Sequence, residues 1–425
     1  MSDLAVKLFA GAYAALALAL PFEMWVSYRR GDGNYRSSEA TSSLALALIF
    51  QVADILTRSL PLFAYAYVSS FMPRRLPLDR AWAWIVGLLV VDFGEYWAHR
   101  AMHRINLLWA VHEVHHSGED FNLATGPRQA FYAQLASLPL KLPLALVVPF
   151  PMFAVLEAAS LIYALFLHTR YLGHFGWLGH ILNTPSHHRV HHARNLRYLD
   201  RNHGAVLIVW DRLLGTFERE RQEEPPLFGV TEPLASHGLV DAYLHHPRRL
   251  VRISRATPRL FDKLRVWFAP PEWMPPGVEA LVSAAPEGQP LLDAAGHRLV
   301  DSRASVAVRA YTSLQLLLAV PALPVLAMGS GLSLGARVVV VLLVVETLHE
   351  LRALLALEPA ARLRELARVA AATALVAHWS GGALATCVVA LGAASFAWAA
   401  NLSLAPAVAA PATQTAPSDA AWPAA

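Results

Sequence analysis

Long apolar runs recur along this 425-residue chain and restrict it to a helical membrane architecture. A helix needs about 20 apolar residues to cross a hydrocarbon core roughly 30 Å thick, and within that core a helix satisfies its own backbone hydrogen bonds. Hydrophobic residues make up 56% of the sequence and charged residues 16%, a balance that excludes an ordinary soluble domain. We therefore predict an all-α, multi-span integral membrane protein. The runs occupy 4–26, 44–72, 81–98, 131–169, 308–328, 333–351, 366–380 and 383–404.

Two of these runs contain features that change how they are expected to cross. Gln51, Asp54 and Arg58 follow one another at spacings of three and four, which predicts one polar helix face turned into the bundle. Prolines interrupt the run 131–169 and break its helix into two pieces. We interpret that run as a re-entrant hairpin, which enters the membrane and returns on the same side.

The positions of Lys and Arg predict the orientation of the spans. Threading the spans places the loops 27–43, 99–130, 170–306 and 352–365 on one side, and that side collects most of the positive charge. By the positive-inside rule this side is cytoplasmic, and the composition, rich in Ala and Arg, indicates a bacterial inner membrane. The net charge of +4 is spread over these loops, which argues against nucleic acid as a partner.

Five segments follow from this organisation. We predict N-terminal transmembrane helices at 1–90, a catalytic domain at 91–220 that includes the re-entrant hairpin, a cytoplasmic segment at 221–306, C-terminal transmembrane hairpins at 307–404 and a disordered tail at 405–425. The catalytic domain would present a histidine-rich, two-metal cap at the cytoplasmic face.

Thirteen of the nineteen histidines fall between positions 94 and 217, most of them in three groups beside apolar runs. Spacings of three and four place two imidazoles on one helix face, and imidazole is the commonest metal-ligating side chain near neutral pH. Three such groups exceed what a single metal ion can use, so the pattern predicts two ions. The groups are His99 with His103, then His112, His115 and His116, then His188, His191 and His192, with His168 placed to contribute as well.

The chemical type of the donors narrows the choice of metal. Cys387 is the single cysteine, which excludes a thiolate site and an internal disulfide. A nitrogen-rich shell suits two iron ions, because imidazole binds iron well and leaves positions open for dioxygen, whereas zinc is the competing metal. An apolar setting around such a centre favours oxidation of an aliphatic chain.

Other interpretations of the histidines have different consequences. The segment from His112 to His116 satisfies the zinc-protease motif H-E-x-x-H, but such an enzyme would use only these two histidines and Glu113 as its base. A metal transporter or sensor would place such residues within its spans, whereas these groups lie at span ends. Single histidines are usually interfacial, which is our interpretation of His174, His180, His237, His245, His246, His297, His349 and His378.

A resemblance to the fatty acid hydroxylase and sterol desaturase superfamily of membrane di-iron enzymes is found in two stretches. They are EYWAHRAMHRINLLWAVHEVHHSGEDFNLATGPRQ at 95–129 and LNTPSHHRVHHARNLRYLDRNHGAVLIVWDRLLGTFERE at 182–220. Both are most similar to the alkylglycerol monooxygenase branch, and the SGEDFN segment and the apolar runs beyond 306 favour that branch.

The resemblance implies a reaction, its partners and a ligand set. The reaction would use dioxygen to insert one oxygen atom into the ether-bearing carbon of a glyceryl ether, giving a hemiacetal that falls apart to an aldehyde and glycerol. Fatty acyl chains, sterols and carotenoids are alternative substrates, and desaturation is an alternative outcome. No haem motif is visible in the sequence, so the electrons would come from a separate donor. The expected partners are therefore this electron donor, the lipid substrate and the bilayer. The implied ligands of two iron ions are His99, His103, His112, His115, His116, His168, His188, His191 and His192.

Further residues are predicted around this centre. In the resembling branch the position after the second histidine is acidic and tied to tetrahydrobiopterin, but here it is Arg104. The reversed charge argues against a pterin contact and in favour of another reductant. Asn122 and Arg128 are candidates to orient a polar head group, with backbone or carboxylate contacts as the alternative. Possible additional ligands or hydrogen-bond partners of the ligands are His187, His203, Asp92, Glu95 and Glu113. For the three acidic residues, helix capping or water contacts are an equal alternative.

Overall fold

The structure, a computed structural model, is helical wherever its chain is described, and it contains isolated β-bridges but no strand in that part. The described residues are 3–73, 75–232, 234, 238–278, 302–320, 322–323, 326, 333–380 and 382–405. The predicted all-α class is thereby confirmed. Nearly all of the predicted tail lies outside the described residues, as do His237 and His297.

The helices follow the apolar runs of the sequence, with shorter helices between them. In chain order they are α1 (Asp3–Arg30), α2 (Ser37–Thr57), α3 (Ser59–Ser70), α4 (Ala81–Arg104), α5 (Asn106–His116), α6 (Ala133–Lys141), the 3-10 helix η1 (Leu142–Leu146), α7 (Phe150–Phe166), the 3-10 helix η2 (Gly176–His180), α8 (Pro185–His191), α9 (Val209–Leu214), α10 (Leu239–Ala256), α11 (Leu260–Phe268), α13 (Val306–Ala319), α15 (Leu334–Leu355), α16 (Ala361–Ser380) and α17 (Gly382–Ala400).

The run 44–72, predicted as one span, forms two helices instead. α2 ends at Thr57 and α3 begins at Ser59, with Arg58 between them. Pro61 explains the division, because it has no N–H to donate to the carbonyl of Thr57. The polar face predicted for this run does turn inward, since Asp54 is 1% exposed and pairs with Arg58.

The proline-rich run divides as its sequence predicts. Pro143 lies in the first turn of η1, and Pro149 directly precedes α7, so each proline marks a helix start where its missing N–H costs nothing. α4 packs against both α6 and α7. The broken hairpin therefore forms one wall of the space beside α4, the helix that carries the first histidines.

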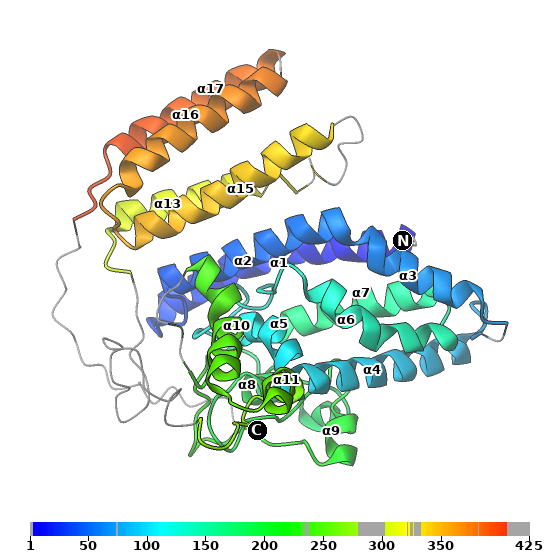
Figure 1. The fold of residues 1–425 in the computed structure, drawn as a ribbon. Coiled ribbons are helices and arrows are strands. Elements are labelled where there is room, and N and C mark those ends of the chain that lie inside the picture. Colours follow the sequence, from blue (N-terminus) through cyan, green and yellow to red (C-terminus); the bar gives the residue numbers. More distant parts are fainter. Residues whose placement is uncertain are drawn as a thin grey trace.

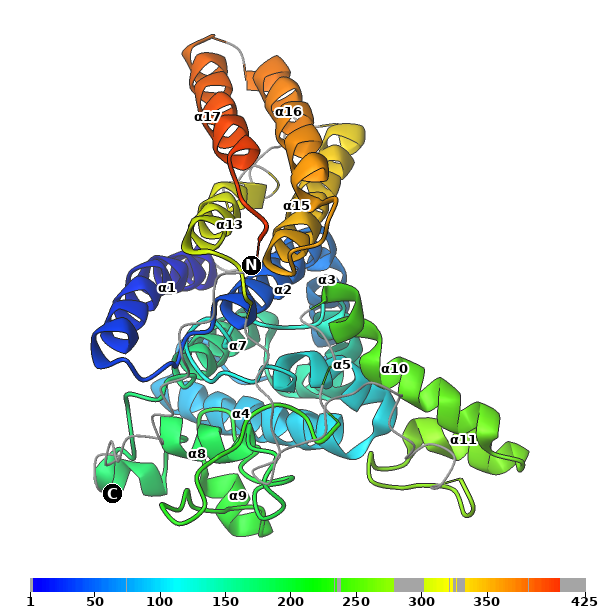
Figure 2. The ribbon, with the colours of Figure 1, turned by 90° about the vertical axis from the view of Figure 1, so that its left-hand side faces the viewer.

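The main hydrophobic core joins segments that are far apart in the sequence. Leu46 of α2, Val114 of α5, Leu239 of α10 and Leu348 of α15 all belong to one buried cluster. Figure 1 and Figure 2 show α13 and α15 between α2 and the α16–α17 hairpin, which lies farthest from the histidine-bearing helices α4, α5 and α8. The C-terminal helices thus support the N-terminal part from one side and leave the histidines on the other.

One helix of the described chain, α2, is long and apolar enough by length and composition to cross a membrane. Phe150–Phe166, Val306–Ala319 and Ala385–Ala400 are shorter apolar helices. Helix length and composition in the described residues therefore support one span, whereas the sequence analysis predicts several.

Candidate metal centre

Three short stretches of helix bring the histidines to one place. Ile105 has an extended backbone, so the chain turns between α4 and α5 and the two helices pack together. The start of α8 is fixed by Thr184, whose side chain accepts a hydrogen bond from the backbone N–H of His187, and by Pro185 in the first turn. α8 can therefore begin directly after the loop that returns from the broken hairpin.

All nine histidines predicted as ligands lie in two compact groups. Eight of them are buried and His99 is half-buried. Within each group, one ring nitrogen from every member lies within 4.8 Å of the others, close enough for all to reach one ion. The first group is His99, His103, His112, His116 and His191, and the second group is His115, His168, His188 and His192.

Backbone carbonyls fix the tautomer of four of these imidazoles. In each case Nδ1 lies at hydrogen-bond distance from a carbonyl oxygen, which can only accept, so Nδ1 carries the proton and donates it. The lone pair is then on Nε2, the atom that faces the other histidines, as in a metal-bound imidazole. The pairs are His99 with the carbonyl of His203 at 2.8 Å, and His115 with Arg128, His168 with Ala164 and His191 with Arg201, each at 2.9 Å.

In the second group, the Nε2 atoms of three imidazoles lie close together. Nε2 of His168 lies 3.2 Å from Nε2 of both His188 and His192, and these two atoms are also 3.2 Å apart. Because Nε2 of His168 has no proton, at most two protons are available for three contacts. Nitrogen atoms bound at about 2.0–2.1 Å to one ion would themselves stand roughly 3 Å apart. The spacing therefore fits a metal ion better than a hydrogen-bonded triangle.

Burial keeps the imidazoles uncharged. It lowers the pKa of His115 to about 4. Burial, and after it the neighbouring histidines, hold the pKa values of His188, His191 and His192 well below the usual range. A neutral imidazole offers its lone pair to a metal at neutral pH, whereas a protonated one cannot. The donor set is thus ready to bind metal without first losing protons.

The other predicted histidines differ in their relation to these groups. His203 forms a further candidate set of donors with His103 and Asp200, so it adjoins the first group. The imidazole of His187 is buried, neither of its nitrogens has a hydrogen-bond partner among the described residues, and it packs edge-on against His174, outside the candidate donor sets.

The predicted acidic neighbours contact other parts of the chain. Asp92 accepts hydrogen bonds from the backbone N–H groups of Val206 and Leu207 and from Nε1 of Trp210, at 2.8, 3.2 and 2.8 Å. Asp92 therefore ties α4 to the segment that follows His203.

Glu113 is engaged by α10. Its two carboxylate oxygens lie 3.0 Å from Nδ1 of His245 and 3.0 Å from the backbone nitrogen of His246. These two histidines, interpreted from the sequence as interfacial, anchor α10 to α5 instead. A protease base needs a free carboxylate beside its zinc ligands, and Glu113 is not free in this sense.

Asn122 and Arg128 bind the protein rather than an open space. Arg128 is 2% exposed and donates to the carbonyl of Val114, to Ser117 and to Glu39. Asn122 donates to the carbonyl of Asn34 at 2.7 Å. Neither lines a cavity that reaches the histidines, and their contacts match the backbone and carboxylate alternative for both residues.

Asp211 supports the site, although the sequence analysis did not single it out. It is fully buried and accepts hydrogen bonds from the backbone N–H groups of His203 and Gly204 and from the hydroxyl of Thr216, at 2.8, 2.7 and 2.7 Å. It thereby holds the carbonyl of His203 that receives the Nδ1 proton of His99. The sequence offered only a weak signal for this role, because Asp211 is a single acidic residue in a short apolar stretch, eight positions after His203.

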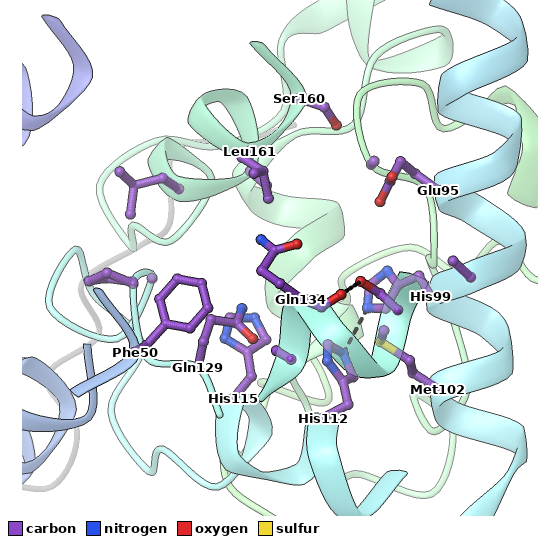
Figure 3. A pocket seen from close by; sticks show the side chains of 18 of the residues that line it. Phe50, Glu95, His99, Met102, His112, His115, Gln129, Gln134, Ser160 and Leu161 are labelled. Carbon is purple, nitrogen blue, oxygen red and sulfur yellow. Dashed lines mark hydrogen bonds between the residues drawn. The ribbon is translucent and has the colours of Figure 1, made fainter. Parts of the chain in front are cut away.

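Two of the cavities in the described part of the protein reach the histidines, and each of the nine lines one of these two. Cavity I has a volume of about 240 Å³ and is lined by His99, His112, His115, His168 and His188. Figure 3 shows Phe50, Met102 and Leu161 on its walls.

Cavity II has a volume of about 400 Å³ and is lined by the other four, His103, His116, His191 and His192. Trp109, Asp200, Glu232, Arg249 and Glu272 complete its more polar wall. The histidines thus form a partition between the two spaces.

The geometry and the donor atoms define a class of protein, a helical protein with buried histidine groups that could each hold a metal ion. Comparison with known proteins agrees. The model of the fatty acid hydroxylase family matches residues 84–216, the stretch that contains all nine histidines. The chain belongs to the fatty acid hydroxylase family, and the superfamily predicted from the two histidine-rich stretches is confirmed.

The relatives differ in the lipids that their names give. The alkylglycerol monooxygenase of Homo sapiens is 38% identical over 252 residues, 59% of this chain and 56% of the human protein. An ornithine lipid hydroxylase of Rhizobium tropici is 31% identical over 55% of this chain and 74% of its own length. A Delta(7)-sterol 5(6)-desaturase of Aspergillus fumigatus is 27% identical over 54% of this chain and 78% of its own.

The chain spans little more than half the length of the alkylglycerol monooxygenases that it matches, 56% for the human and 58% for the Xenopus tropicalis protein. No solved structure matches significantly.

Proposed function

We propose that this protein is an iron-dependent membrane oxygenase that hydroxylates a C–H bond of a lipid, with an alkylglycerol-type ether lipid as substrate. The observation that carries the proposal is the pair of neutral histidine groups facing a cavity with apolar walls. Two iron ions, held by the nine histidines, would supply the reduced metal that activates dioxygen. The identity of 38% with a protein named alkylglycerol monooxygenase supports the choice of substrate.

The residues of cavity I would position the substrate. One oxygen atom of dioxygen enters the C–H bond and the other leaves as water, which consumes two electrons and two protons from a donor. Phe50, Met102 and Leu161 would hold the alkyl chain and exclude water from the reacting carbon. On an ether-bearing carbon the product is a hemiacetal, which separates into an aldehyde and glycerol without further oxidation.

Cavity II is our proposed route for the reductant. It reaches four of the histidines, and its wall is more polar than that of cavity I. Arg104, placed where the resembling branch has an acid, lies 2.6 Å from Asp200 and 2.8 Å from Glu272 at this cavity. Its charge is thus neutralised by two carboxylates. We propose a separate electron donor that approaches here, in place of tetrahydrobiopterin.

The membrane location has support beyond the apolar runs. Large apolar side chains are exposed on the outer faces of α1 and α4, among them Leu18 (77%), Phe22 (63%) and Ile85 (63%). Water disfavours such a surface, and a bilayer favours it. We propose a multi-pass protein of a bacterial inner membrane, with the centre and cavity II facing the cytoplasm and 131–169 as a re-entrant hairpin.

Metal analysis and one labelled substrate test this proposal. Protein purified from iron-supplemented cells should contain about two irons per chain, one for each histidine group. With dioxygen and a reductant, 1-O-[alkyl-14C]hexadecylglycerol should yield labelled hexadecanal. A single bound zinc with peptidase activity would overturn the class. Iron without any aldehyde would overturn the substrate and leave the class intact.

A further inference from the structure

A charged cluster lines cavity I in addition to the histidines. Lys141 of α6 lies between Glu95 of α4 and Glu157 of α7, with its Nζ 3.2 Å from Oε1 of Glu95 and in contact with Glu157. The three side chains are only 12–17% exposed. Burying three charged side chains costs free energy, so we expect them to have a structural or functional role. The histidine centre itself makes no use of them.

The cluster is close to the histidines. Glu95 precedes His99 by four residues on α4, so the two side chains lie on the same face, about 6 Å apart along the helix axis. Both line cavity I, and Figure 3 shows them on the same helix beside the cavity. Lys141 also lines a smaller adjoining cavity, of about 70 Å³, together with Glu157. The charged groups therefore stand one helical turn from the proposed metal site.

Two polar side chains on the wall of cavity I have no hydrogen-bond partner in the described part of the protein. The carboxyl groups of Glu95 and Glu157, by contrast, pair with Lys141 and hydrogen-bond each other. The side chain of Gln134 projects into cavity I, and Ser160 lies beside it near Glu95 (Figure 3). Neither the Gln134 amide nor the Ser160 hydroxyl hydrogen-bonds another described residue. Ser160 is buried and Gln134 half-buried, and polar groups so shielded from water are normally hydrogen-bonded, so a ligand is a suitable partner.

We propose that Glu95, Lys141, Glu157, Gln134 and Ser160 form a head-group site that binds an uncharged, hydroxyl-bearing lipid head group. The amide of Gln134 and the hydroxyl of Ser160 both donate and accept hydrogen bonds, so together they can satisfy the hydroxyl groups of a ligand. A glycerol unit bound there leaves the adjoining ether-bearing carbon one helical turn away, beside the histidines. This inference rests on the proposed function and adds the residues that select the substrate.

The charges of the site argue against an anionic head group. Lys141 is already paired with Glu95 and Glu157. The other cation that lines cavity I, Arg58, is paired with Asp54. A phosphate or a fatty acid carboxylate would thus find no free cation to pair with.

Binding measurements on the purified full chain test the head-group site. Gln134→Leu removes no hydrogen bond within the described protein, so its fold should survive. We expect it to bind tritiated 1-O-hexadecylglycerol about tenfold more weakly, the effect of one or two lost hydrogen bonds. Its binding of hexadecyl methyl ether, which has the same chain and no hydroxyl, should be unchanged. Gln222→Leu, in an exposed loop, is the matched control and should bind both ligands as the native protein does.

The same ligands give the outcomes that would overturn the site. A head-group role is contradicted if Gln134→Leu weakens the binding of both ligands equally, or if it leaves the binding of hexadecylglycerol unchanged. It is also contradicted if the native protein binds hexadecanoate as tightly as hexadecylglycerol. These measurements need no turnover, so they stand apart from the proposed function. If the protein binds hexadecylglycerol through Gln134 but never oxidises it, the head-group site stands and the proposed oxygenase function is wrong. In turnover, Gln134→Leu should raise KM about tenfold and leave kcat nearly unchanged.

Discussion

Replacing Asp211 by alanine tests whether the first histidine group depends on a residue that touches none of the proposed metal ions. The substitution leaves two buried backbone N–H groups, those of His203 and Gly204, without their acceptor, and the hydroxyl of Thr216 keeps only Tyr96 as a partner. An orphaned buried donor costs about 1–3 kcal/mol, so the free energy of unfolding should fall by at least about 2 kcal/mol. The apparent Tm in detergent should fall by a few degrees.

The metal should respond separately from the fold. Without Asp211 the carbonyl of His203 is no longer fixed, and His99 loses the partner that orients its ring. Loss of such a supporting contact weakens metal binding about 10–100-fold. Iron competition with a chelator should therefore show one weakened site and one unchanged site, because His99 belongs only to the first group.

Thr216→Val is the matched control for this prediction. It removes one of the three donors and leaves the contacts of Asp211 with His203 and Gly204 in place. It should cost about 1 kcal/mol and leave both iron affinities unchanged. The reasoning is refuted if Asp211→Ala unfolds at the same temperature as Thr216→Val, or if it binds both irons as tightly as the native chain.

Four further substitutions have definite expected outcomes. His188→Ala and His191→Ala should each lower the iron content from about two to about one per chain by mass spectrometry, because each removes a donor from one group only; two irons in either variant would contradict the ligand assignment. Gly204→Ala should lower the Tm clearly, since its Cβ would come within 2.4 Å of a backbone carbonyl oxygen, and an unchanged Tm would show that this turn can shift. Arg128→Met should cost about 3–5 kcal/mol in chemical unfolding, because it removes the cation 3.1 Å from the buried Glu39; a loss below 1 kcal/mol would count against the importance of that pair.

The spacing of the histidines predicted that nine of them meet, but it could not predict how they divide. His115 and His116 are neighbours in the chain, yet they belong to different groups, and the same is true of His191 and His192. Successive residues on a helix point about 100° apart, so an adjacent pair faces two directions. Which direction leads to which group depends on how α4, α5, α7 and α8 pack, and that depends on contacts from the whole chain.

The residues that sequence analysis missed have distant partners. Lys141 meets Glu95 across two helices, and Asp211 meets the backbone after His203, and neither pair follows a repeat or a motif. Asn122 and Arg128 were candidates for substrate contact because polar residues near a motif suggest function. The partner that explains Arg128, Glu39, lies far away on α2. Local patterns identify candidate metal donors because several must share one helix face, whereas single buried ion pairs leave no such pattern.

The partition formed by the histidines has a kinetic consequence. Cavity I and cavity II approach the centre from separate sides and share none of the nine histidines. Under the proposed assignment, a lipid in one and a reductant at the other do not compete for the same space, so both can be bound at once. Initial rates measured over a grid of lipid and reductant concentrations should then give intersecting double-reciprocal lines, the pattern of a ternary complex, rather than the parallel lines of a ping-pong exchange.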